Sequence, residues 1–321
     1  MLKGSVFATS AMLMVGSSVA VMGVLRHFPV YTGQALRFAL AAGLLLVVLK
    51  LQDRRTGERA PTVTGPQWLR ITVLAAIGMV GFNVAIVAAE QRTDPALVGV
   101  IVGCAPVVIA LITPVLAKTP PSRRILLAGL VVTAGAALAQ GLGSSTSTLG
   151  MVLSVGALMG EVVFALVAAP LLSSLGALRV STYACVIAVP VCLIGMVATG
   201  KYAVPDGDQL LALLWLSVVV TAGAYVLWFT AVGSIGPERA GLFTSLVPIS
   251  AVGVTALLGT GQPTWGHAFG AITVLLGLLV GLTARKEPDF IVARGADELA
   301  RHAPWAGHSA SSADSARADG R

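Results

Sequence analysis

Charged residues are scarce in this chain: Asp, Glu, Lys and Arg make up 11% of its 321 residues, whereas a soluble domain carries about 25%. Hydrophobic residues make up 56%, and the mean hydropathy is +0.89. The apolar runs are about 20 residues long, enough to cross roughly 30 Å of hydrocarbon as a helix. The scarcity of charge excludes a water-soluble globule and indicates a multispan membrane protein in a lipid bilayer.

Cysteine and histidine are also few, at three and four residues. Cys104, Cys185 and Cys192 all lie within predicted helices and have no C-x-x-C spacing, so neither a disulfide framework nor a metal site is predicted. No H-E-x-x-H or G-x-S-x-G motif occurs. The motifs that an intramembrane enzyme needs are missing, and we expect no catalytic activity and no cofactor.

Acidic residues are outnumbered by basic ones, 14 to 21, which leaves a net charge of +7. The basic residues gather in alternate loops, as in the segment 50–70. This asymmetry places the basic loops and both termini in the cytoplasm, and it gives no support for nucleic-acid binding. The excess of Arg over Lys, with abundant Ala and Gly, hints at a GC-rich bacterium. The expected location is the bacterial plasma (inner) membrane.

The chain contains an internal repeat with an offset of 142 residues. Matching positions form a narrow stripe on a helix, because they are spaced three or four residues apart. A repeat that covers half the chain decides the fold and has to be found first. The first copy of the stripe is Gly99, Gly103, Pro106, Ala110, Thr113 and Ala117, and the second is Gly241, Ser245, Pro248, Val252, Thr255 and Gly259.

Hydropathy predicts an all-α membrane protein with ten transmembrane helices in two five-helix repeats. The repeats are residues 1–142 and 150–284, joined by a linker at 143–149, and a cytoplasmic, largely disordered tail follows at 285–321. Because five is odd, the second repeat is inverted relative to the first. The predicted helices are 4–25, 31–50, 68–89, 95–117, 124–142, 150–172, 179–199, 210–232, 240–259 and 266–284.

The tenth predicted helix carries four glycines on one face: Gly266, Gly270, Gly277 and Gly281. Small residues let helix backbones approach closely in lipid. The seam predicts packing against another helix of the same chain. A homodimer interface through these glycines is the alternative.

Glu161 lies near the middle of the sixth predicted helix, where a charge is expensive and commonly functional. Its helix face is small and partly polar, which suits the bundle interior better than lipid. Burial favours the protonated form of a carboxylate, so Glu161 is a candidate for proton coupling. The alternative is a permanently protonated structural residue.

Four further side chains are candidates for lining a substrate cavity: Arg37, Asn83, Tyr225 and Trp228. Arg37 either extends to the outer interface or faces a carboxylate or an anionic substrate. Tyr225 and Trp228 are i and i+3 on one helix and form either an aromatic wall for an organic, possibly cationic, substrate or part of the core. Tyr225 occupies the repeat position of Asn83.

Pro106 and Pro248 occupy matching positions within predicted helices. A proline in mid-helix removes a backbone hydrogen bond and bends the helix, and paired broken helices point to a transport site. These prolines are candidates for helix kinks with a gating role. The hydroxyls of Thr244 and Ser245 are candidates for satisfying the freed carbonyl and for lining the cavity.

Taken together, the chain resembles the EamA-type branch of the drug/metabolite transporter superfamily over residues 4–284. The resemblance implies alternating-access transport of small metabolites through a central cavity. Segment 156–163 is also similar to the first helix of the small multidrug resistance transporters, in which the glutamate matching Glu161 binds protons and cationic drug in competition. The residues that carry the wider resemblance are Arg37-Phe38, Ala41, Asp94-Pro95-Ala96, Pro106, Gly236-Pro237 and Pro248.

The leading hypothesis is a secondary active transporter of small metabolites or drugs that works as a proton-coupled exporter. Its partners would be a small-molecule substrate, protons and the bilayer. The alternative is an uncoupled facilitator or importer of amino acids or related metabolites. An intramembrane enzyme lacks the motifs it would need, and a membrane scaffold does not explain the paired prolines and the buried acid.

Overall fold

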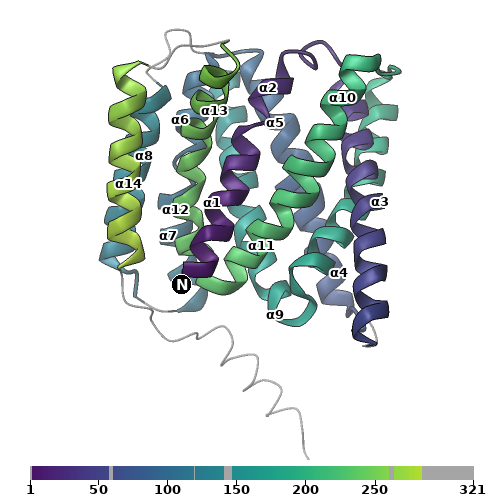
Figure 1. The fold of residues 1–321 in the computed structure, drawn as a ribbon, viewed down its shortest axis with the longest axis horizontal. Coiled ribbons are helices and arrows are strands. Elements are labelled where there is room, and N and C mark those ends of the chain that lie inside the picture. Colours follow the sequence, from purple (N-terminus) through teal and green to yellow (C-terminus); the bar gives the residue numbers. More distant parts are fainter. Residues whose placement is uncertain (1, 58–60, 119, 141–146, 260–263, 284–321) are drawn as a thin grey trace, which may run out of the picture. The chain divides into compact units, whose positions relative to one another are not determined.

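The computed structural model describes residues 2–57, 61–118, 120–140, 147–259 and 264–283, and all regular secondary structure in these ranges is helical (Figure 1). Residues 1–284 form one compact unit, and the predicted tail lies outside the described residues. The first half contains α1 (Leu2–Gly16), α2 (Val19–Met22), α3 (Val30–Thr56), α4 (Gly65–Val73), η1 (Leu74–Gly81), α5 (Phe82–Glu90), α6 (Pro95–Val102), α7 (Ala105–Ala117) and α8 (Arg123–Gln140). The second half contains α9 (Thr148–Thr199), α10 (Gly207–Trp215), η2 (Leu216–Gly223), α11 (Ala224–Ile235), α12 (Pro237–Leu242), η3 (Phe243–Ser245), α13 (Leu246–Leu257) and α14 (Trp265–Leu282).

Eight helical stretches in the described residues are long and apolar enough to cross a membrane. The predicted count of ten is therefore not reproduced. One reason is α9, whose 52 residues form one assigned helix although Gly176 within it is not helical, with φ 75° and ψ 162°. Helix α8, with 18 residues, is not among the eight stretches.

The repeat is visible in the element boundaries. Two short π-helices, η1 and η2, span eight residues each and begin at Leu74 and Leu216, which are 142 positions apart. The helices α8 and α14 share this offset at both ends. A π-turn inserts an extra residue into the helical ladder and is found frequently at functional sites.

Helix entry is repeated as well. Thr64 and Gln67 form a capping box at the start of α4, in which each side chain bonds the backbone of the other. Asp206 and Gln209 do the same at the start of α10, again 142 positions later. Capping satisfies backbone donors that the first turn of a helix leaves free. Both copies therefore start these helices by the same device with different side chains.

Both copies of the proline helix are interrupted. The first breaks at Gly103–Cys104, between α6 and α7, and Pro106 is the second residue of α7. The second passes through the 3-10 turn η3 between α12 and α13, and Pro248 is the third residue of α13. The interruption precedes each proline because the ring disfavours helical geometry on its N-terminal side.

The glycine seam of α14 faces α8 of the same chain. A Cβ on Gly277 would lie 2.6 Å from Cγ1 of Val132, and the carbonyl oxygen of Gly270 lies 2.9 Å from the Cβ position of Gly135. Gly266 similarly faces Leu138, and Gly281 faces Leu242 and Ala128. The seam is thus occupied within the chain, and the alternative of a homodimer through these glycines finds no support.

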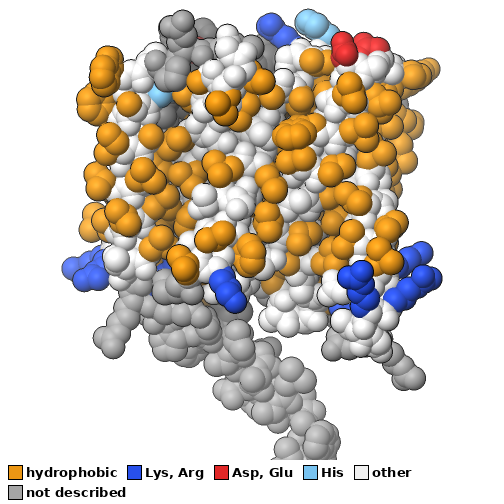
Figure 2. All heavy atoms as spheres, viewed as in Figure 1, with side chains coloured by type: hydrophobic (Ala, Val, Ile, Leu, Met, Phe, Trp, Pro, Cys, Tyr) orange, Lys and Arg blue, Asp and Glu red, His pale blue; other side chains and the backbone are white. Residues whose placement is uncertain are grey.

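The remaining surface of α14 is apolar and exposed. Figure 2 shows hydrophobic side chains across the middle of one face of the molecule, with most of the visible Lys and Arg at one end and the visible Asp and Glu at the other. This pattern fits a lipid-facing belt with a basic margin. The large apolar residues exposed on α14 are Trp265, Phe269, Ile272, Leu275, Leu276, Leu279 and Val280.

Candidate functional site

Arg37 of α3 connects the two halves of the chain in the interior of the bundle. Its side chain is buried, with 8% exposed. Nε donates a 2.6 Å hydrogen bond to Oγ1 of Thr221, which lies in η2. Nη1 donates to Oδ1 of Asn83 in α5 at 3.2 Å. The guanidinium is therefore held between a residue of the first half and a residue of the second half, and it does not extend to the outer interface.

Both acceptors are fixed by the π-helices. The Thr221 hydroxyl donates to the carbonyl of Leu216, five residues earlier, at 2.8 Å. The amide nitrogen of Asn83 donates to the carbonyl of Met79 in η1 at 2.7 Å. Thr221 was not predicted as a site residue, because its repeat mate is Met79 and offers no polar side chain to compare. The sequence feature that could have identified Thr221 is its hydroxyl group within an otherwise largely apolar segment.

Glu161 lies on α9 and is half-buried. Within the described part of the chain its carboxylate forms neither a hydrogen bond nor an ion pair. Close backbone packing surrounds it: a Cβ on the neighbouring Gly160 would lie 3.0 Å from Cβ of Phe82. Likewise, a Cβ on Gly78 of η1 would lie 3.0 Å from Cα of Phe164. Small residues thus let η1 and α5 approach α9 at the level of this acid.

An aromatic cluster lies next to Glu161. The ring of Phe164, one helical turn further along α9, is 5.1 Å from that of Tyr225 and 5.0 Å from that of Phe229, measured between centroids. Phe164 and Phe229 are buried, and Tyr225 is partly exposed. Such tilted ring pairs are favourable beyond the burial of their area. Phe164 and Phe229 were not predicted as site residues, because spacing alone does not distinguish them from core residues.

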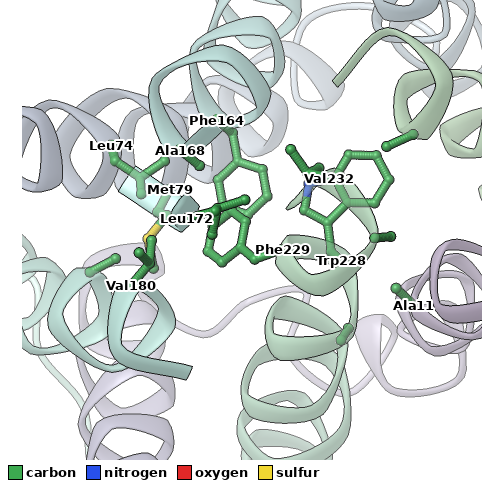
Figure 3. Packing of buried hydrophobic residues seen from close by; sticks show 14 of the residues in the cluster. Ala11, Leu74, Met79, Phe164, Ala168, Leu172, Val180, Trp228, Phe229 and Val232 are labelled. Atoms are coloured by element: carbon green, nitrogen blue, oxygen red, sulfur yellow. The ribbon is translucent and has the colours of Figure 1, made fainter. Parts of the chain in front are cut away.

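Trp228 does not share a wall with Tyr225. Figure 3 shows the rings of Phe164 and Phe229 together, with the Trp228 indole on the side nearer Ala11 of α1. Trp228 is 2% exposed, and its Nε1 has no hydrogen-bond partner in the described residues. Its position is that of a core residue.

Tyr225 links the charged residues of the site. It lies within electrostatic range of the Arg37 guanidinium and the Glu161 carboxyl group. Arg37 acts in the same way on Cys185 and Cys192 of α9, which are both fully buried. The Arg37 guanidinium of α3 and the Glu161 carboxyl group of α9 therefore both lie within electrostatic range of the Tyr225 phenol of α11.

The hydroxyls near Pro248 are used locally. Thr244 donates to the carbonyl of Gly241 at 2.8 Å, and Ser245 donates to that of Leu242 at 2.6 Å. No hydrogen bond in the described part of the chain joins them to Arg37. At the first-half break, Thr133 of α8 donates to the carbonyl of Gly103 at 3.1 Å. Hydroxyls therefore satisfy carbonyls at both interruptions, as irregular backbone within a membrane requires.

The repeat mate of Arg37 is Arg179, and its surroundings differ. Arg179 donates from Nη2 to Oδ1 of Asp53 at 2.5 Å, and both side chains are partly exposed. This ion pair joins α9 to the C-terminal turns of α3. Among the same residues, no group of three or more His, Cys, Asp and Glu side chains could hold a metal ion.

A duplicated apolar bundle, with helices interrupted at matching positions and opposite charges unpaired in its interior, has the architecture of a membrane transporter. The chain belongs to the EamA-like transporter family, whose sequence model matches residues 2–140 and 148–283. It is thus a membrane transporter of the drug/metabolite transporter superfamily.

Two curated relatives from Bacillus subtilis (strain 168) match most of the chain. It is 26% identical to the uncharacterized transporter YetK over 291 residues, which is 87% of each protein. It is 24% identical to the uncharacterized transporter YyaM over 276 residues, covering 82% of this chain and 88% of that protein. A crystal structure with 16% identity superposes with a TM-score of 0.76 over 88% of this chain and 99% of the other. At that identity the likeness concerns the fold alone.

Proposed function

We propose that this protein is a proton-coupled exporter of small organic molecules, in which Glu161 binds the proton. The observation that carries the proposal is the position of Glu161. Its half-buried carboxylate is without a hydrogen-bonding partner in the described residues and lies at the level where η1 and α5 pack against α9. An acid that served only the fold would be expected to be hydrogen-bonded, because an unsatisfied polar group in a membrane costs several kcal/mol.

The proposed topology has ten spans. Dividing α9 at Gly176 and counting α8 adds two spans to the eight that length and hydropathy identify. Five spans per half make the repeats 1–142 and 150–284 inverted copies, with the basic loops and both termini in the cytoplasm. The proposed location is the bacterial plasma (inner) membrane.

In this mechanism, the proton and a cationic group of the substrate compete for Glu161. From the acidic outer side a proton binds and displaces the substrate, and its release to the cytoplasm restores the charged site. Competition for one carboxylate suffices to couple two ligands. The interrupted helices around Pro106 and Pro248 would bend to open the site to each side in turn, with the hydroxyls of Thr244 and Ser245 keeping the broken backbone satisfied.

The proposal can be tested with purified protein in liposomes under an imposed pH gradient. Transport of candidate amines and zwitterions is compared between wild type, Glu161→Gln and Glu90→Gln. Glu90 is a matched control, because it is an exposed acid at the end of α5. We expect Glu161→Gln to lose gradient-driven transport and Glu90→Gln to keep it.

Counterflow that persists in Glu161→Gln, with transport in wild type insensitive to the gradient, would instead indicate an uncoupled facilitator or importer. That result removes proton coupling and leaves the transporter assignment intact.

A further inference from the structure

We infer that Arg37 is the receptor for a carboxylate group of the substrate, so that the transported molecules carry a carboxylate beside an apolar or aromatic body. This inference rests on the proposed function and specifies its substrate class. Its evidence is the hydrogen bonding and charge around Arg37, which is independent of the argument for Glu161.

The positive charge of Arg37 has no ion-pair partner among the described residues. Arg37 is 8% exposed, and no carboxylate in the described residues lies within ion-pair distance of its guanidinium, the charged group of arginine. An uncompensated charge in the interior of a membrane protein is costly. The repeat mate Arg179 has the opposite arrangement: it is more accessible and is paired with Asp53. Of the two arginines at matching repeat positions, Arg179 therefore has a carboxylate partner and Arg37 has none among the described residues.

The guanidinium of Arg37 has N–H donors that are not used by the described residues. A guanidinium has five N–H donors, and Arg37 uses two of them on neutral oxygens of Thr221 and Asn83. These bonds orient the group without neutralising it. Its Nη2 donates to no atom of the described residues. The free donors match the planar, two-oxygen geometry of a carboxylate, which arginine recognises better than lysine does.

The ionisable groups near Arg37 among the described residues do not form an ion pair with it. Glu161 acts electrostatically on the same Tyr225 as Arg37 does, but no ion pair joins the two charges. The thiols of Cys185 and Cys192, which Arg37 also influences, are fully buried and carry no formal charge. Among the described residues, none places a negatively charged group in ion-pair contact with the guanidinium. A bound ligand is therefore the source that the arrangement leaves open.

Aromatic rings next to the charged groups indicate what the rest of the ligand would contact. The same Tyr225 packs against Phe164 and Phe229, so the charged region borders an aromatic one. A molecule with a carboxylate at Arg37 would place an apolar or aromatic body against these rings. Where it also carries the cationic group that competes with protons at Glu161, the substrate is a zwitterion.

The experiment measures binding to the detergent-solubilised full chain by thermal shift and by tryptophan fluorescence, without a pH gradient. The probes are 3-phenylpropionate and 4-methylpentanoate, each compared with its neutral amide. We expect wild type to bind a carboxylate at least about tenfold more tightly than its amide, since charge-assisted hydrogen bonds are worth more than neutral ones. Arg37→Gln should lose this preference, and Arg37→Lys should retain part of it.

Arg179→Gln is the matched control, because it removes a cation at the repeat position and should leave the preference unchanged. Asn83→Ala guards against misfolding of the Arg37 variants: it keeps the guanidinium but releases Nη1, and should weaken carboxylate binding while leaving amide binding unchanged. Equal affinity of wild type for carboxylates and amides overturns the inference, as does an equal loss for both in Arg37→Gln and in Asn83→Ala. Because no gradient is used, these outcomes do not depend on whether Glu161 couples transport to protons.

Discussion

Arg37 and Thr221, which are 184 positions apart in the chain, form a 2.6 Å hydrogen bond that joins the two repeats in the interior of the bundle. Thr221 owes its position to the π-helix η2, in which its hydroxyl reaches the carbonyl five residues earlier. In a regular α-helix the backbone would pair at four residues. The π-turn therefore contributes directly to how the arginine is held.

Replacing Thr221 with Val keeps the shape of the side chain and removes the acceptor for Nε of Arg37. We expect the free energy of unfolding to fall by about 1.5–3 kcal/mol, which is the range for a hydrogen bond to a charged group. Melting in detergent measures this loss, and Thr221→Ser should restore most of it. A Thr221→Val protein as stable as wild type would show that the bond contributes little.

Gly277→Ala tests the packing of α14 on α8. The added Cβ would lie 2.6 Å from Cγ1 and 3.0 Å from the backbone nitrogen of Val132. The helices must separate, and overpacking of this kind costs about 1–3 kcal/mol. We expect a lower melting temperature. The control is Gly253→Ala on α13, where a Cβ meets nothing within 4 Å and the helix should gain stability.

Gly176→Ala tests the break within α9. The backbone at Gly176 has φ 75° and ψ 162°, a region open essentially to glycine alone, and forcing another residue there costs about 1–3 kcal/mol. A thermal melt should show this destabilisation, although the added Cβ has space around it. Gly156→Ala, in the regular part of the same helix and equally free of contacts, should be neutral or stabilising.

How far the sequence could predict this molecule depended on the kind of signal. The offset of 142 residues could be found by comparing residue types along the chain. Element boundaries in the structure, such as Leu74 and Leu216, follow the same offset. The π-turns themselves were not predictable, because a local hydrogen-bond shift leaves hydropathy unchanged.

For the site, the sequence made Asn83 a candidate for the cavity and left Arg37 open between the outer interface and an anionic partner. It could not predict the hydrogen bond between them, since that bond joins separate helices. Spacing also grouped Tyr225 with Trp228, whereas the rings beside Tyr225 are Phe164 and Phe229. Neighbours on one helix can be read from a wheel. Contacts across helices require the crossing geometry, which a single sequence does not contain.

The pH dependence of carboxylate binding provides the last prediction. Charged Glu161 lies near the same Tyr225 as Arg37, so it repels a carboxylate bound at the guanidinium, and protonation of Glu161 removes this repulsion. Binding of 3-phenylpropionate should therefore strengthen as pH falls from 8 to about 6, a range in which the probe itself stays ionised because free carboxyls titrate near 4.

Ligands with a cationic group should show the opposite sign, because protons compete with them at Glu161. In Glu161→Gln both dependences should disappear, and 3-phenylpropionate should bind at every pH as tightly as it binds wild type at low pH. Titrations of wild type, Glu161→Gln and Glu90→Gln at three pH values measure this. An unchanged pH dependence in Glu161→Gln would place the titrating group elsewhere and separate Glu161 from the Arg37 site.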